Sequence, residues 1–355
     1  MKSASALDSK KFSPAVLEWY DCHGRKDLPW QQQITPYRVW ISEIMLQQTQ
    51  VNTVISYFHR FMQRFPDVKT LAQANMDDVL HLWSGLGYYA RARNLYKTAV
   101  VILQKYNGEF PDNLEALANL PGIGLSTAGA ILSLSMNISA AILDGNVKRV
   151  LARVCAIDEW PGQLKIIRQL WEIAISLTPQ ERVANYNQAM MDLGAMICTR
   201  SQPKCSACPL MFCCQAYQQK NVSAYPVAKP KKSLPKRQAY FLILQNHANE
   251  ILLIKRPAVG IWGGLWSLPE CSAPQMLNDW SKQNLACQLS DIEVMPDVQH
   301  VFSHFQLTLV PIKAKVKKQL PLIMESAEQV WYKKGKQQTI GLPAPIQKIL
   351  EEVSV

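Results

Sequence analysis

The chain has 355 residues, 48% of them hydrophobic, and is therefore long enough for two domains that each bury a core. Its net charge of +11 favours a polyanionic partner such as nucleic acid. No apolar stretch at the N-terminus is long enough for a signal peptide, and no run approaches the roughly 20 apolar residues that span a membrane. We expect a monomeric cytoplasmic protein without a membrane partner, associated with the nucleoid if the source is bacterial.

Helical periodicity dominates the first part of the chain. Apolar residues recur on one face over residues 51–61 and again over residues 95–103. Thr35 and Pro36 are placed to cap and begin a helix, and Gly108 is placed to end one. This part is therefore predicted to be all-helical.

A single acid stands in the apolar stretch WISEIMLQQTQV, residues 40–51. Apolar surroundings raise the pKa of a carboxyl group, so Glu43 would keep a proton available for donation. On the pattern alone, a partly exposed glutamate on a helix is the simpler interpretation.

Residues 120–134 read LPGIGLSTAGAILSL, and a Leu-Pro-Gly-Ile-Gly turn (120–124) between helical segments is typical of a helix-hairpin-helix. Gly122 and Gly124 have no Cβ, so their backbone N–H groups can approach a DNA phosphate at the start of a helix. An ordinary glycine-rich connection between two helices is the alternative.

Asp144 follows the hairpin and lies just before a helical stretch, VKRVLARV. Asp is a good N-cap, and helix N–H donors favour the charged form of a carboxylate. An ionised Asp144 beside a reacting sugar would stabilise a positive, oxocarbenium-like centre. A purely structural cap is compatible with the same pattern.

Five of the nine cysteines lie within CTRSQPKCSACPLMFCC, residues 198–214. This crowding favours a metal site in a reducing compartment over a disulfide framework. Four cysteines in one turn-rich loop can hold a [4Fe-4S] cluster, and a zinc knuckle also fits. Spacing alone leaves open whether Cys213 or Cys214 is the last ligand. The remaining cysteines are expected in the core: Cys22, Cys155, Cys271 and Cys287.

A composition change divides the chain after residue 224. Residues 225–237 (YPVAKPKKSLPKR) contain five basic residues, three prolines and no acid, as in a basic linker. Residues 238–355 contain short apolar runs separated by turns, the stretch HVFSHFQLTLVPIKAKV alternates like one long strand, and the C-terminus returns to helix. The predicted fold is multidomain: an all-α domain (1–224), the linker, and an α+β domain (238–355).

Taken together, these motifs resemble a known enzyme family. LPW, SEIMLQQTQV, GLGYYARARNL, DGNVKRVLAR and NQAMMDLGAMIC are similar to the MutY-type adenine DNA glycosylases, and they occur in the family's order. The resemblance implies a helix-hairpin-helix glycosylase that excises adenine mispaired with 8-oxoguanine, or with guanine, from double-stranded DNA. Gaps of six, two and five residues match the [4Fe-4S] loop of the wider endonuclease III superfamily, whose ligands would be Cys198, Cys205, Cys208 and Cys214.

The resemblance also implies catalytic roles. Adenine is flipped out of the duplex, Glu43 protonates its N7, and Asp144 stabilises the sugar cation before water adds. Asn146 would orient Asp144 or the water. Lys148 and Arg149 are expected to contact phosphate or to remain solvated.

Ser126 stands where strand-cleaving superfamily members carry a lysine. Serine cannot form an imine, so the chain lacks that nucleophile and is expected to be a monofunctional enzyme that uses water.

Flipping leaves a gap in the duplex, and the resemblance places Gln48 and Tyr88 in it, with Thr49 and Leu86 nearby. An aromatic ring such as that of Tyr88 can replace lost base stacking. Alternatively, Tyr88 and Tyr89 simply begin the next helix.

In the second domain, GIWGGLWSLPE (residues 260–270) resembles the Nudix fold. The helix expected after it lacks the glutamates that hold Mg²⁺, so pyrophosphate hydrolysis is not expected. The resemblance implies an inactive Nudix-like module that recognises 8-oxoguanine through Phe302, Ser303 and His304. An ordinary strand is the alternative for these residues.

Two other functions remain open at this point. One is an endonuclease III-like glycosylase-lyase for oxidised pyrimidines, against which Ser126 and the second domain argue. The other is a non-catalytic DNA-binding regulator, in which Glu43 and Asp144 are structural.

Overall fold

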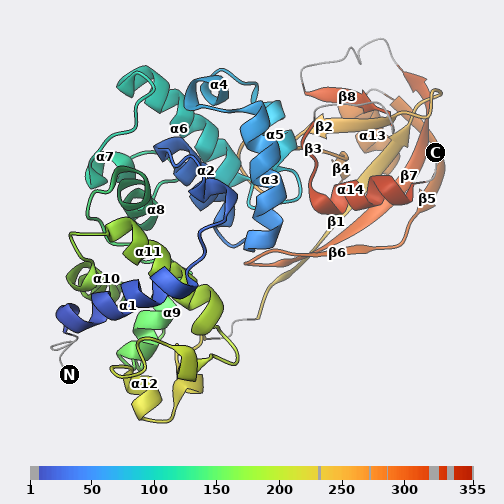
Figure 1. Cartoon of the computed structure of the whole chain (residues 1–355). Coiled ribbons are helices and arrows are strands. Elements are labelled where there is room, and N and C mark those ends of the chain that lie inside the picture. The colour runs from blue at the N-terminus through green and yellow to red at the C-terminus, as the bar shows by residue number, and fades with distance from the viewer. Residues whose placement is uncertain are drawn as a thin grey trace. The chain divides into compact units, whose positions relative to one another are not determined.

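The computed structural model (Figure 1) describes residues 8–230, 233–271, 273–285, 287–319, 328–333 and 340–353. The chain forms two compact units. The first comprises Met1–Gln73 and Asn94–Lys231, and the second comprises Ala74–Arg93 and Lys232–Val355. Residues 74–93 thus pack with the part of the chain that follows the linker. Within the described residues, no helix is both long and apolar enough to cross a membrane.

The part of the chain before the linker is helical, as predicted. Its helices are α1 (Ser9–His23), α2 (Pro36–Leu46), α3 (Val51–Arg64), α4 (Val68–Ala72), α5 (Met76–Trp83), α6 (Ala90–Tyr106), α7 (Leu114–Ala118), α8 (Leu125–Ala130), α9 (Gly145–Val154), α10 (Leu164–Leu177), α11 (Val183–Asp192) and α12 (Gln215–Gln218). The predicted cap is present, since the Thr35 hydroxyl accepts from the Arg38 N–H and Pro36 begins α2. π-helical turns follow α8 and α11, and such turns are frequent near functional sites.

One apolar core joins α1, α9, α10 and α11, which contribute Phe12, Val150, Leu170 and Met190 among others. It fixes the start of α9, where Asp144 is the N-cap. The expectation that Cys22 belongs to a core is wrong, because this residue is exposed near the end of α1.

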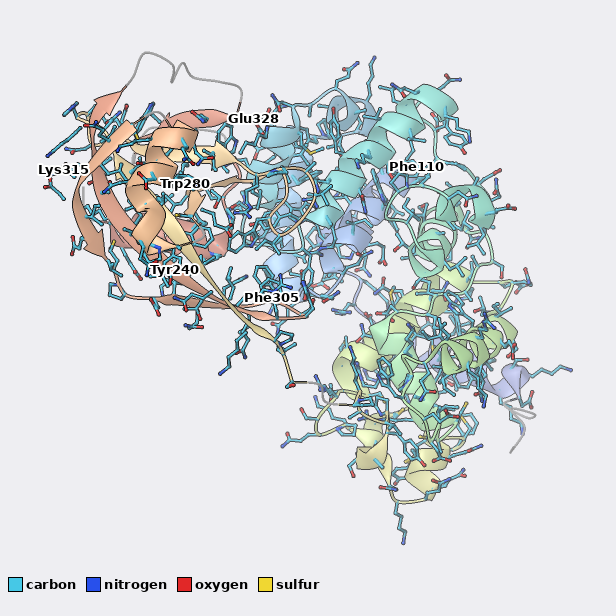
Figure 2. The ribbon with its side chains drawn as sticks, turned by 180° about the vertical axis from the view of Figure 1, so that it is seen from behind. Phe110, Tyr240, Trp280, Phe305, Lys315 and Glu328 are labelled. Carbon is cyan, nitrogen blue, oxygen red and sulfur yellow. The ribbon has the colours of Figure 1, made fainter. Side chains whose placement is uncertain are left out.

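The second unit contains an eight-stranded sheet with the central order β3-β2-β1-β7-β5. Its strands are β1 (Lys236–Gln245), β2 (Ile251–Lys255), β3 (Trp266–Ser267), β4 (Glu270–Cys271), β5 (Cys287–Val294), β6 (Val298–Val301), β7 (Gln306–Gln319) and β8 (Gln329–Tyr332). β1 and β7 pair in parallel over ten residues. Helices α13 (Leu277–Leu285) and α14 (Ala344–Glu352) complete the predicted α+β architecture. Tyr240 and Trp280, labelled in Figure 2, pack against a core that contains Cys271 and Cys287.

The stretch expected to be one long strand is two antiparallel strands, β6 and β7. They are joined by a tight turn, Phe302–Phe305, called here the recognition turn. The Phe302 N–H donates to the Phe305 carbonyl at 2.9 Å, and the two rings stack with centroids 4.6 Å apart. Alternating hydrophobicity does not show this break, because the turn itself is aromatic. Ser303 and His304 are exposed at its tip.

The predicted linker is anchored at its first residue. Tyr225 is buried, and its hydroxyl donates to Asp158 at 2.7 Å. β1 begins at Lys236, inside the predicted linker. Lys231 and Lys232 lie outside the described residues.

Candidate active site

A cavity of about 1050 Å³ in the first unit collects many of the predicted site residues. It is as large as a typical ligand pocket. The predicted residues that line it are Glu43, Gln48, Thr49, Ser126, Asp144 and Asn146. They come from α2 and the loop after it, from α8, and from the start of α9, so the fold brings together residues about a hundred positions apart.

Glu43 lies on α2 between the buried residues Ser42 and Ile44. Desolvation by burial raises the pKa of Glu43 to about 8, and the charge of Asp144 adds to this effect. At neutral pH the Glu43 carboxyl group therefore retains its proton.

Asp144 has the cap geometry expected from the sequence. Its Oδ1 accepts from the Val147 N–H at 2.8 Å, and its Oδ2 accepts from the Asn146 side chain at 3.0 Å. Burial raises the pKa of Asp144, whereas these hydrogen bonds and the charge of Arg149 lower it. The net pKa shift is upward, although the cap donors favour the charged form as the sequence predicts.

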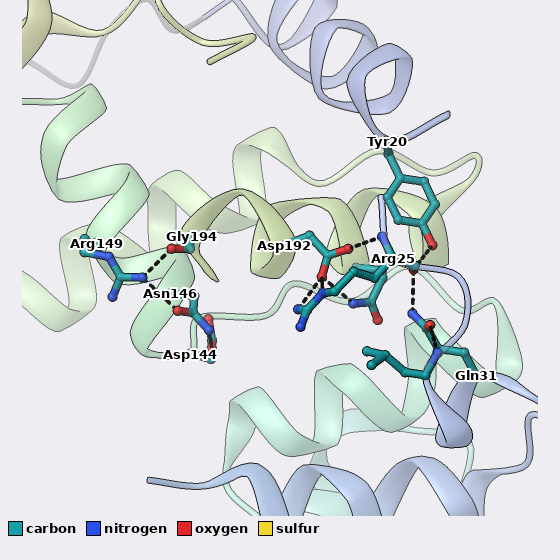
Figure 3. A network of polar contacts seen from close by, with 10 residues as sticks. Tyr20, Arg25, Gln31, Asp144, Asn146, Arg149, Asp192 and Gly194 are labelled. Atoms are coloured by element: carbon teal, nitrogen blue, oxygen red, sulfur yellow. Dashed lines mark hydrogen bonds and ion pairs between the residues drawn. The ribbon is translucent and has the colours of Figure 1, made fainter. Parts of the chain in front are cut away.

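Arg149 is half-buried and makes hydrogen bonds within the protein that the sequence did not indicate. Its Nη2 donates to Asn146 Oδ1 at 2.8 Å and to the Gly194 carbonyl at 2.6 Å (Figure 3). Its Nε donates to the Cys198 carbonyl at 2.7 Å. A Cβ at Gly194 would lie 2.5 Å from the Asn146 Cβ, so glycine is needed for this close approach. Arg149 thus connects Asp144, through Asn146, to the backbone of the cysteine loop.

A second polar network lies at the cavity (Figure 3), and the sequence motifs did not predict it. Asp192 is fully buried and accepts from the Arg25 backbone N–H at 2.8 Å, from Arg25 Nε at 2.9 Å and from Gln188 Nε2 at 2.9 Å. Arg25 and Gln188 both line the cavity. In the sequence, this network is indicated by a glutamine and an aspartate that lie four positions apart in the apolar stretch NQAMMDLGAM.

Cys198, Cys205, Cys208 and Cys214 line one small, largely apolar pocket, together with Val150 and Leu210 among others. Cys213 is not among its lining residues. Within the described part of the chain, no three His, Cys, Asp or Glu side chains lie close enough to hold a single metal ion. The four thiols predicted as ligands are thus brought together around one pocket.

The buried side chain of Arg153 also fits an anionic group in this pocket. It is 2% exposed, and its Nη1 lies 3.2 Å from Cys198 Sγ. Its other partners are backbone carbonyls, those of Thr199, Arg200 and Tyr225. No ion pair with a carboxylate is found for Arg153 in the residues described. Arg153 thus places a buried positive charge beside this pocket.

The two residues expected to enter the duplex share an unusual backbone conformation. Gln48 has φ +58° and Tyr88 has φ +48°, although neither is glycine. Residues in this left-handed region are strained, and such strain gathers at functional sites. Both side chains are exposed, whereas Leu86 is buried. Neither Tyr88 nor Tyr89 lies within α6, which begins at Ala90.

The predicted hairpin lies between α7 and α8. Gly122 has φ +77°, and a Cβ there would lie 2.7 Å from the Asn94 Cβ, so this position requires glycine. Gly124 is the N-cap of α8, and a Cβ there would meet no atom within 4 Å. The start of α8 is therefore open to an approaching phosphate.

The sequence and fold match known DNA repair proteins. The HhH-GPD superfamily of base excision DNA repair proteins matches residues 41–174, and the NUDIX domain matches residues 239–352. The adenine DNA glycosylase of Buchnera aphidicola subsp. Acyrthosiphon pisum (strain APS) is 46% identical over 96% of this chain and 97% of its own. That of Rattus norvegicus is 35% identical over 85% of this chain and 70% of its own.

The fold agrees with a solved structure, a non-covalent endonuclease III–DNA complex. That protein is 21% identical, covers 61% of this chain and 99% of its own, and superposes with a TM-score of 0.51. The resemblance inferred from the sequence motifs is therefore confirmed. From its helical HhH-GPD domain, its Nudix-like domain and its full-length relatives, the chain belongs to the adenine DNA glycosylase family of base excision repair enzymes.

Proposed function

We propose that this protein removes adenine mispaired with 8-oxoguanine, or with guanine, from double-stranded DNA by base flipping and acid-assisted hydrolysis. The observation that carries the proposal is the cavity in which a protonated Glu43 faces a hydrogen-bonded Asp144. One group to donate a proton and one to stabilise positive charge is the division of labour that glycosidic bond cleavage requires.

In the proposed reaction, flipped adenine enters the cavity and Glu43 donates its proton to N7. The base leaves with the bonding electrons, and Asp144 stabilises the cation that develops on the sugar. Water then adds at C1′ and loses a proton. Asn146 and Arg149 hold Asp144 in place, since Asn146 donates to Asp144 and Arg149 donates to Asn146.

The proposal includes water rather than a lysine as the nucleophile. Ser126 lines the cavity, and its hydroxyl accepts from the Leu143 N–H at 3.2 Å. Lys26 also lines the cavity, but its ammonium group donates to the Asp21 carbonyl at 2.7 Å and lies over the Tyr20 ring. We therefore expect no efficient imine formation.

A glycosylase assay on defined duplexes tests this function. We expect single-turnover release of adenine opposite 8-oxoguanine and, more slowly, opposite guanine, with strand breakage only after alkali. Cleavage without alkali, trapped by borohydride, would support a lyase instead, and Lys26→Ala would then identify the nucleophile. Binding without any base release would indicate a non-catalytic regulator.

The pH dependence of base release follows from the two carboxyl groups. Glu43 must be protonated, so the single-turnover rate constant should fall about tenfold per pH unit above a pKa of about 8. Asp144 must be ionised, so the rate should also fall in acid, at a pH above the ordinary range of aspartate because the pKa of Asp144 is raised. A rate that stays constant through pH 9 would exclude Glu43 as the acid.

We also propose that the recognition turn distinguishes 8-oxoguanine from guanine. Residues 238–355 contain 11 basic and 10 acidic residues, so this part adds little phosphate neutralisation. Its exposed Ser303 and His304 are placed to contact a base edge instead. The double variant Ser303→Ala/His304→Ala should keep adenine release opposite guanine and lose much of the preference for 8-oxoguanine, about tenfold for two lost hydrogen bonds. An unchanged preference would locate recognition elsewhere.

Finally, we propose one [4Fe-4S] cluster held by Cys198, Cys205, Cys208 and Cys214. When bound, such a group cross-links its four thiolates and supplies negative charge. Arg153 would neutralise part of that charge and tie the loop to Tyr225, the first residue of the linker. The exposed Arg200 and the nearby Lys204 would then be held for phosphate contact.

A further inference from the structure

Within the second unit, two hydroxyl groups attach the loop that carries Leu86 and Tyr88 to the C-terminal part of the chain. This segment, residues 84–89, is called here the wedge loop. At its start, the Ser84 hydroxyl donates to the Leu342 carbonyl at 3.0 Å. At its end, the Tyr89 hydroxyl donates to the same carbonyl at 3.1 Å and accepts from the Gly85 N–H at 3.4 Å. One carbonyl oxygen thus holds both ends of the wedge loop.

The residue before Leu342 is bonded to the Nudix-like loop, residues 260–270. The Trp266 N–H donates to the Gly341 carbonyl at 2.9 Å. A Cβ at Gly341 would lie 2.9 Å from the Leu265 side chain and 3.0 Å from Leu80 Cβ in α5, so the three segments are in close contact. This acceptor is therefore held in a packed environment.

The same Nudix-like loop contacts the helix after the wedge loop and the recognition turn. Arg93 Nη1 donates to the Gly263 carbonyl at 2.6 Å. The adjacent Trp262 ring packs on Phe302 of the recognition turn, with centroids 5.6 Å apart, and on His300 at 5.9 Å. A continuous series of contacts thus runs from the recognition turn to the base of the wedge loop.

The wedge loop is also stiff within itself. Trp83 Nε1 donates to the Gly87 carbonyl at 3.2 Å, and Arg91 Nη2 donates to the carbonyls of Leu86 and Gly87. The Arg91 guanidinium lies 5.6 Å from the centre of the Tyr88 ring. A stiff loop transmits a displacement of its ends to the side chain at its tip.

We propose that Tyr89 and Ser84 are positioning residues through which the 8-oxoguanine-recognising unit sets the wedge loop for entry into the duplex. The inference rests on the proposed function, in which the recognition turn contacts 8-oxoguanine and Tyr88 enters beside it. With the recognition turn seated on 8-oxoguanine, the Leu342 carbonyl holds both ends of the wedge loop, and Tyr88 is pre-organised to intrude. Opposite guanine the recognition turn is not seated on the base. The two hydrogen bonds to the Leu342 carbonyl then increase the rate of adenine release less.

Tyr89→Phe tests this in the full-length enzyme, because it removes the hydroxyl and keeps the buried ring. Ser84→Ala removes the other donor, Ser84→Thr retains it, and Tyr106→Phe at the end of α6 is the matched control. Single-turnover adenine release is measured opposite 8-oxoguanine and guanine, together with the fluorescence of a 2-aminopurine placed next to the orphaned base to report intrusion of Tyr88.

Tyr89→Phe and Ser84→Ala should each lower the preference for 8-oxoguanine, by about tenfold for a lost hydrogen bond, and reduce the 2-aminopurine response. The rate opposite guanine should stay within about twofold, and Ser84→Thr and Tyr106→Phe should match wild type. An unchanged preference for 8-oxoguanine overturns the inference. An equal fall in the rate of adenine release opposite both bases also overturns it, because that result indicates a merely structural role. A wild-type enzyme without any preference for 8-oxoguanine would instead overturn the proposed function.

Discussion

Glu43→Gln is expected to reduce single-turnover adenine release by about 10²–10⁴-fold, the range that general acid catalysis contributes. The amide has nearly the shape of the acid but carries no proton to donate to N7. Duplex binding, measured by gel shift, should stay close to wild type, because Glu43 faces the cavity rather than phosphate. Glu172→Gln on α10, outside this cavity, is the matched control and should be fully active.

The thermal stability of Glu43→Gln distinguishes a loss of catalysis from a loss of folding. The pKa of Glu43 is raised above its ordinary value, so the fold favours the neutral form. Its contribution to stability is therefore complete below the ordinary pKa of 4.5, falls steadily as the pH rises, and is gone above about 8. Glu43→Gln has no such titration and should melt no lower than wild type above that pH. A variant that is inactive and also melts lower would not support the role of general acid.

Asp144→Asn is the complementary change to the second carboxyl group. An asparagine side chain still accepts from the Val147 N–H and so preserves the cap, but it carries no charge to stabilise the sugar cation. We expect a loss of about 10²–10³-fold, the scale of a removed electrostatic stabiliser. Asp158→Asn, which weakens the bond to Tyr225 outside the cavity, should be active. Substantial activity of Asp144→Asn would mean that the cap alone is required.

The two carboxyl groups differ in the donors that surround them. Burial raises the pKa of both, but the Asp144 carboxylate accepts two hydrogen bonds and lies near Arg149. For Glu43 the charge of Asp144 adds to burial, so both influences act in the same direction. An ionised Asp144 thus helps keep Glu43 protonated. These donors favour the charge states that the proposed mechanism requires, a protonated Glu43 and an ionised Asp144.

Local sequence was sufficient to predict the elements whose determinants are local. The Thr35 cap and the Asp144 cap depend on neighbours within a few residues, and both are present. The pattern of four cysteines likewise lies within one short loop. Such features need no knowledge of tertiary packing.

Features that depend on tertiary contacts were not predictable in the same way. Arg149 was expected to contact phosphate or to remain solvated. Its partners, the carbonyls of Gly194 and Cys198, lie more than forty residues away in the sequence. The buried pair of Arg25 and Asp192 spans a still longer separation. Residues 74–93 pack with residues that follow the linker, so these contacts join parts of the chain that are far apart in sequence. Periodicity and motif spacing contain no information about such partners.

Cys214→Ser is expected to remove the iron–sulfur cluster, whereas Cys213→Ser is not. Purified wild-type protein should be brown and contain about four irons per chain, with little zinc. Cys214 lines the same pocket as the other three thiols, so serine at this position leaves one iron without a thiolate. Cys213 is adjacent in sequence, but its thiol donates to the Leu210 carbonyl at 3.4 Å and packs on the core of α1, α9, α10 and α11. Metal analysis of the two variants provides a matched comparison.

The effect of Cys214→Ser should extend beyond the metal. Without a cross-link the loop loses its fixed position, and the buried Arg153 loses its negative partner. The Cys198 carbonyl then no longer holds Arg149, the residue that supports Asn146 and, through it, Asp144. We therefore expect a lower melting temperature, weaker DNA binding and slower adenine release, in parallel with iron loss across partly loaded preparations. Zinc in place of iron, or iron loss from Cys213→Ser but not from Cys214→Ser, would refute the assignment of the four ligands.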